Sequence, residues 1–99
     1  MRPLTTDERR RAEDAARVLA SPVFRGAFDV IDTELTDTMK HGASAEEREG
    51  AWRDYQALCR VKGRLFHLLE TAAFREEKAG SLKRLLEKVN ILHRRGSHE

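Results

Sequence analysis

The stretch from Ser44 to Ala79 contains no proline and only two glycines, Gly50 and Gly63. A single helix over this stretch is about 50 Å long, because an α-helix rises 1.5 Å per residue. Gly80 and Ser81 follow, a pair that either ends the helix or bends it. The sequence therefore predicts one long helix and leaves open whether Gly80 breaks it.

Capping signals divide the remainder of the chain into further helices. A capping box pairs Ser or Thr with an acidic residue three positions later, and a proline suits the first turn of a helix. A glycine just beyond a helix favours the left-handed backbone conformation that ends it. These signals are a box at Thr5 and Glu8, Ser21 before Pro22, the terminating Gly42, and a second box at Ser44 and Glu47.

Apolar residues recur at helical spacing, and no alternation with a period of two persists anywhere in the chain. Between Phe24 and Met39 they form one stripe, and a second stripe lies between Leu82 and Leu92. We therefore predict an all-α fold: an antiparallel helical hairpin with a short N-terminal helix and a C-terminal helix. Residues 1–99 are expected to form a single all-helical domain, with 94–99 as a loose tail.

The apolar surface of the long helix spans an arc of roughly 200°, whereas packing against one partner needs about 100°. Together with the stripe after Gly80, this exceeds what one small chain is expected to bury, so we predict a homo-oligomer. Its expected interface consists of Trp52, Cys59, Gly63, Phe66, Leu82, Leu85, Leu86, Val89 and Leu92.

Gly63 lies inside this apolar arc, where a glycine costs about 1 kcal/mol relative to alanine. Either it allows another helix backbone to cross closely, or it provides a functional kink. A close crossing predicts that Gly63→Leu is far more damaging than Gly50→Leu, by about 1–3 kcal/mol of overpacking.

The opposite side of the long helix carries a basic stripe, which consists of Arg53, Arg60, Arg64 and His67. The net charge is −3 over residues 1–50 and +5 over residues 51–99. One interpretation is that the arginines are solvated or pair with acids, either of a neighbouring chain or of the preceding helix, which carries Asp29, Asp32, Glu34 and Asp37. The other is a non-specific contact with DNA phosphates, because such contacts require basic side chains and carry no base information.

Several functional classes lack their sequence signals. There is no phosphate-binding loop or dinucleotide fingerprint, and Cys59 and His67 lie about 12 Å apart along a helix, too far for a catalytic dyad. We expect no enzyme, no cofactor and no metal site. A single cysteine, and the lack of a leader or membrane-spanning segment, lead us to expect a cytoplasmic protein without membrane contact.

Three segments, "RVLASPVFRGAFDVIDTEL", "EREGAW" and "CRVKGRLFHLLETA", resemble a group of small helical proteins of tailed bacteriophages and related prophages. The shared features are Pro22 followed by Ala27-Phe28, Glu49 before Trp52, Lys62-Gly63-Arg64-Leu65, and Glu70-Thr71. The resemblance covers roughly residues 12–79. Two positions depart from the group: Ser21 stands where an acid often precedes the proline, and Ala72 where a glycine often follows Glu-Thr.

This resemblance implies a role in particle assembly or genome packaging in a bacterial host cytoplasm. A self-associating helical hairpin is similar to the oligomerisation core of small terminase subunits, so the implied partners are a large packaging-motor subunit or another virion protein. We therefore predict a non-enzymatic oligomeric adaptor. The alternative is a nucleic-acid-binding regulator that uses the basic stripe; a helix-turn-helix reader is disfavoured because its recognition helix would be acidic.

Overall fold

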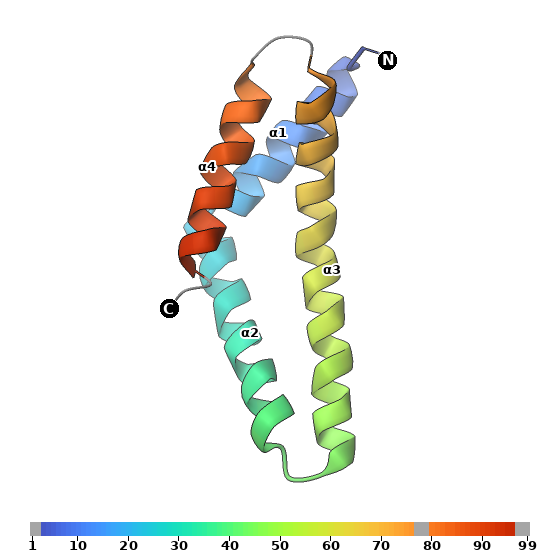
Figure 1. The fold of residues 1–99 in the computed structure, drawn as a ribbon, viewed down its shortest axis with the longest axis vertical. Helices are drawn as coiled ribbons and strands as arrows, with labels where there is room; N and C mark the ends of the chain where they lie inside the picture. The colour runs from blue at the N-terminus through green and yellow to red at the C-terminus, as the bar shows by residue number, and fades with distance from the viewer. Residues whose placement is uncertain (1–2, 77–79, 97–99) are drawn as a thin grey trace.

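The computed structural model describes residues 3–76 and 80–96, and this part of the chain contains four helices and no strand. The helices are α1 (Thr6–Ala20), α2 (Pro22–His41), α3 (Ala45–Arg75) and α4 (Ser81–Gly96). Figure 1 shows α2 and α3 running antiparallel as a hairpin, while α1 and α4 lie beside the other half of α3. The predicted all-α fold with an antiparallel hairpin is confirmed.

The first two helices begin where the capping signals placed them. The Thr5 hydroxyl accepts a hydrogen bond from the Glu8 N–H, and the Glu8 carboxylate accepts one from the Thr5 N–H, both at 3.0 Å. Ser21 caps α2 by accepting a hydrogen bond from the Phe24 N–H at 3.3 Å, and Pro22 occupies the first helical position. These local patterns fix the helix starts because they satisfy otherwise unpaired N–H groups.

The turn between α2 and α3 differs in detail from its prediction. Gly42 has φ −56° and ψ 143°, so the expected left-handed conformation is wrong. Its N–H still donates to the Thr38 carbonyl at 2.8 Å, which closes the last turn of α2 without a change of handedness. Ser44 caps α3 as expected, but the Glu47 carboxylate accepts from the Ala43 N–H, one residue before the predicted partner.

The core lies where α1, α3 and α4 meet. α1 contributes alanines and one leucine on a single face, so the helices approach closely, and α4 contributes two fully buried side chains. The core residues are Ala12, Ala16, Leu19, Leu69, Ala72, Ala73, Leu82 and Val89. Burial of these side chains is the main favourable term that holds the three helices together.

This core corrects the prediction that α4 forms part of an oligomer interface. Leu82 is 0% exposed and Val89 is 1% exposed, while Leu85 and Leu86 are partly buried against the same cluster. Leu92 is also partly buried. The reason is that α4 folds back onto α1 and α3 of its own chain, which covers the apolar stripe that the sequence left without a partner.

α3 and α4 are two separate helices rather than one bent helix. α3 ends at Arg75, four residues before the expected end at Ala79, and residues 77–79 lie outside the described part.

At the C-terminus, α4 continues to Gly96, so the loose tail predicted from residue 94 is wrong for 94–96. Residues 97–99 lie outside the described part.

Candidate functional site

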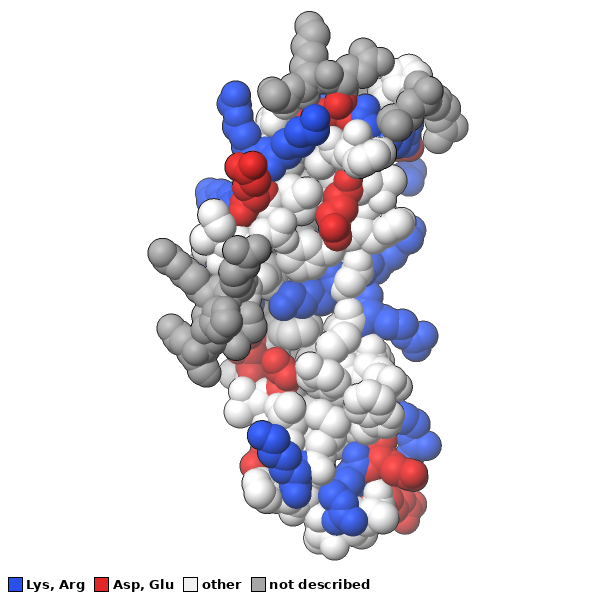
Figure 2. Space-filling model, viewed as in Figure 1, with Lys and Arg blue, Asp and Glu red and all other residues white. Residues whose placement is uncertain are grey.

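The basic stripe lies on the exposed surface of α3, and its end at Arg64 and His67 borders α1. Arg53, Arg60, Arg64 and His67 are all exposed, and the first and last of them are about 21 Å apart along the helix axis. Figure 2 shows basic side chains along this edge of the molecule. No ion pair joins the three arginines to another described residue. Their positive charge is therefore unneutralised within the part of the chain that the structure describes.

The acidic face of α2, which we define as Asp29, Glu34 and Asp37, is exposed as well. Across residues 3–76 and 80–96, no ion pair joins α2 to α3, so the expected pairing of these helices within one chain is wrong. The physical reason is that α2 and α3 meet through their apolar sides, including the buried Phe28 and Ala51. The arginines of the basic stripe consequently lie outside this contact and reach none of the α2 carboxylates in the described part of the chain.

Lys62 is the basic residue that does enter the hairpin interface. Its ammonium lies 4.6 Å from the centre of the Phe28 ring, a cation–π contact that the sequence did not predict. Such contacts are worth about 0.5–2 kcal/mol, depending on desolvation. The contact helps to hold the middle of α2 against α3.

The predicted interface residues on α3 divide into two groups. Phe66 is partly buried because the His93 ring packs edge-on against it, at 5.2 Å between ring centres. Trp52 is 50% exposed and Cys59 is exposed, so both stay predicted interface residues. Gly63, another predicted interface residue on α3, is exposed as well.

The two α3 glycines have open space where a side chain would be. A Cβ built at Gly63 or at Gly50 meets no atom within 4 Å. Among the described helices, none therefore crosses closely at Gly63, and the predicted contrast between leucine substitutions at the two positions is wrong for the isolated chain. A crossing at Gly63 by a second copy stays a prediction.

Some exposed apolar side chains were missed by the sequence analysis. Val23 and Val30 on α2 are 82% and 57% exposed, and Phe74 near the end of α3 is 77% exposed. The first two lie outside the apolar stripe of α2 and were assigned to no surface. Their spacing of seven residues, which puts them on one helix face, was the available signal.

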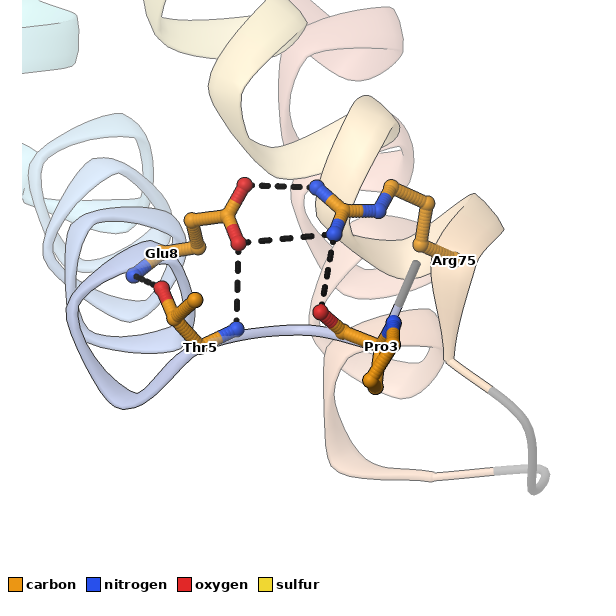
Figure 3. Close-up of polar contacts among 4 residues, drawn as sticks. All are labelled: Pro3, Thr5, Glu8 and Arg75. Atoms are coloured by element: carbon orange, nitrogen blue, oxygen red, sulfur yellow. Dashed lines mark hydrogen bonds and ion pairs between the residues drawn. The ribbon is translucent and has the colours of Figure 1, made fainter. Parts of the chain in front are cut away.

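Ion pairs join the start of α1 to the end of α3, and Figure 3 shows the one between Glu8 and Arg75. Arg75 binds the Glu8 carboxylate at 2.5 and 3.4 Å, and it also donates to the Pro3 carbonyl at 3.0 Å. The Arg75 guanidinium and, after it, the Thr5 backbone N–H lower the pKa of Glu8 from 4.5 to about 2. A second pair joins Arg9 to Glu76 at 3.0 Å. These pairs clamp α1 onto α3.

His93 joins α4 to the end of α1. Its Nε2–H donates to the Leu19 carbonyl at 2.7 Å, one of the acceptors left unpaired where a helix ends. Burial lowers the pKa of His93, the Leu19 hydrogen bond acts in the opposite direction, and the charges of Lys62 and Arg25 lower it further. The neutral imidazole is therefore the form that the folded chain favours.

The described part of the chain holds no metal-binding cluster and no helix suited to crossing a membrane. Among residues 3–76 and 80–96 there is no group of three or more His, Cys, Asp or Glu side chains that could hold a metal ion. None of the helices described is both long and apolar enough to cross a membrane. Comparisons of the chain with models of protein families, with curated proteins and with solved structures found no match.

Proposed function

We propose that the protein is a non-enzymatic adaptor that self-associates, with the acidic face of α2 of one copy against the basic stripe on α3 of the next. The observation that carries this proposal is that, among the described residues, no ion pair joins two exposed, oppositely charged faces of the same hairpin. Because no ion pair joins these faces in the described part of the chain, one copy leaves their charges unsatisfied. A second copy supplies the complementary face.

A contact of this kind is heterologous, since it joins two different surfaces of the subunit. Repetition of such a contact closes into a ring if the rotation between copies allows it, and otherwise produces a filament. Exposed apolar side chains, namely Val30 on α2 and Val61 on α3, border the charged faces and add apolar area to the contact. Exposed ion pairs contribute only about 0–1 kcal/mol each, so the charges determine which faces pair more than they stabilise the contact.

The proposed setting is phage-type particle assembly or DNA packaging, and it rests on the resemblance described above. A ring of helical hairpins resembles the assembly core of small terminase subunits. In this setting the oligomer presents its outer surface to a large packaging-motor subunit or to another virion protein.

Sedimentation velocity and light scattering test the self-association. We expect a mass above that of the 11.4 kDa chain, and we expect it to fall between about 0.05 and 0.5 M salt because surface charges are screened. Arg60→Ala with Arg64→Ala should weaken the association. Lys83→Ala with Arg84→Ala, which removes two exposed charges from α4, is the matched control and should leave it unchanged. A monomer at about 100 µM and low salt contradicts the proposal.

The second candidate is a nucleic-acid-binding regulator. Its support is the line of three exposed arginines, which extends about 16 Å from Arg53 to Arg64 without an ion-pair partner in the described part. If they contact phosphates, Arg60→Ala with Arg64→Ala weakens binding to all DNA sequences alike. It also flattens the log–log salt dependence by about 0.9 per lost contact. Negligible DNA binding by the unchanged protein rules out this candidate.

A further inference from the structure

A groove lies between α1 and α3, on the side of α3 that carries Arg64 and His67. It encloses about 140 Å³. Its apolar lining residues are Leu4, Leu68 and Ala72, which we call the floor of the groove, and Ala72 is 4% exposed. Such a volume holds several water molecules, and therefore a group of the size of a small ligand, but not a helix of another protein.

The walls of the groove carry an excess of positive charge. Arg11 from α1 and Arg64 from α3 line it, and both are exposed. Neither forms an ion pair with another described residue. At one end, Glu8 and Arg75 neutralise each other in the bidentate pair described above. Three arginines and one glutamate line the groove, and together these four side chains carry a net charge of +2.

We propose that this groove binds an organic phosphate monoester. The phosphate lies between the guanidinium groups of Arg11 and Arg64, and the organic part lies on the floor formed by Leu4, Leu68 and Ala72. Guanidinium is planar and presents five N–H donors in a fork that matches the oxygens of a phosphate. A phosphate monoester carries a charge of about −1.5 to −2 at pH 7, which balances the excess of +2.

The charge balance also separates this ligand class from related ones. A carboxylate or a phosphodiester carries a single negative charge and leaves one guanidinium uncompensated. Inorganic phosphate supplies the charge but leaves the apolar floor in contact with water. This site and the proposed self-association contact share Arg64 and therefore compete for it, whereas Arg11 lies on α1, outside the basic stripe, and belongs to this site alone.

Isothermal titration of the full chain with phenyl phosphate tests the proposal, with inorganic phosphate and a short thymidine oligonucleotide as comparison ligands. We expect millimolar binding of phenyl phosphate, tighter than that of inorganic phosphate. Arg11→Gln and Arg64→Gln should each weaken it by about tenfold or more, since each removes charge-assisted hydrogen bonds. Arg10→Gln is the matched control, because Arg10 is an exposed arginine beside Arg11 that does not line the groove.

A second readout does not require any variant. Phenyl phosphate should shift the ring-proton resonances of His67 in the NMR spectrum and leave those of His41, at the far end of α2, unchanged. Binding that is lost equally in Arg10→Gln, or shifts of both histidines, overturns the site. If inorganic phosphate binds as tightly as phenyl phosphate, the floor has no role in binding. If the oligonucleotide binds more tightly than phenyl phosphate, and this binding depends on Arg11, the assignment to a phosphate monoester is wrong. An effect of Arg11→Gln on phenyl phosphate but not on sedimentation separates this site from the self-association contact.

Discussion

Replacement of Leu82 by alanine tests whether α4 packs on its own chain or on another. Leu82 is fully buried among side chains of α1 and α3. The substitution removes the equivalent of three buried carbon groups, which amounts to about 2.4 kcal/mol of transfer free energy at about 0.8 kcal/mol each. The cavity that remains raises the expected loss to about 3–5 kcal/mol. This is a large fraction of the free energy of unfolding of a small domain, which is typically about 5–15 kcal/mol.

The assay is urea denaturation followed by circular dichroism, at about 5 µM and about 100 µM protein, a range in which an association would shift the transition. Thermal melts should show a decrease in Tm of roughly 12–40 °C, at about 4–8 °C per kcal/mol. The control is Ile91→Ala on the same helix, where the side chain is 54% exposed and the expected change is within about 0.5 kcal/mol.

Two results would refute the packing of α4 within the chain. One is a Leu82→Ala loss no larger than that of Ile91→Ala. The other is a loss that is present at the high protein concentration only or at the low one only, because a contact inside one chain does not depend on concentration.

Three further predictions concern single positions. Gly63→Ala should raise the free energy of unfolding by about 0.5–1 kcal/mol in denaturant titrations, since alanine favours the helix and its Cβ has open space; a decrease contradicts this. The low pKa of Glu8 means that its contribution to stability is complete above pH 4.5 and is lost as the pH falls toward 2, so Arg75→Gln should reduce this acid dependence in melts between pH 6 and 2. The pKa of His93 is lowered, so stability should be complete above pH 6.5, the ordinary value, and decrease below it. His93→Gln should show a smaller decrease between about pH 7.5 and 5.5 than the unchanged protein, and an equal decrease contradicts the assignment.

The helices could be predicted because their signals are local. The Thr5–Glu8 box and the Ser21–Pro22 pair act within one turn of helix, so a few neighbouring residues suffice to predict them. Gly42 shows the limit of such signals: glycine permits the left-handed conformation but does not require it.

The packing of α4 and the clamp on α1 could not be predicted because they depend on contacts between distant parts of the chain. Glu8 and Arg75 are separated by 67 residues, and periodicity does not show that their helix ends meet. The apolar stripe on α4 was recognised from its spacing, but spacing does not tell whether Leu82 faces its own chain or another. The basic stripe was predicted in its correct place because its residues share one face of one helix.

Charge reversal on the two faces of the hairpin tests the proposed head-to-tail association most directly. One variant carries Arg60→Glu and Arg64→Glu, and the other carries Glu34→Lys and Asp37→Lys. Each variant then presents two faces of the same sign, so each alone should sediment as a monomer, whereas an equimolar mixture should associate because every contact again joins opposite charges. Association of either variant alone to the same extent as the unchanged protein, or a mixture that stays monomeric, would contradict the account.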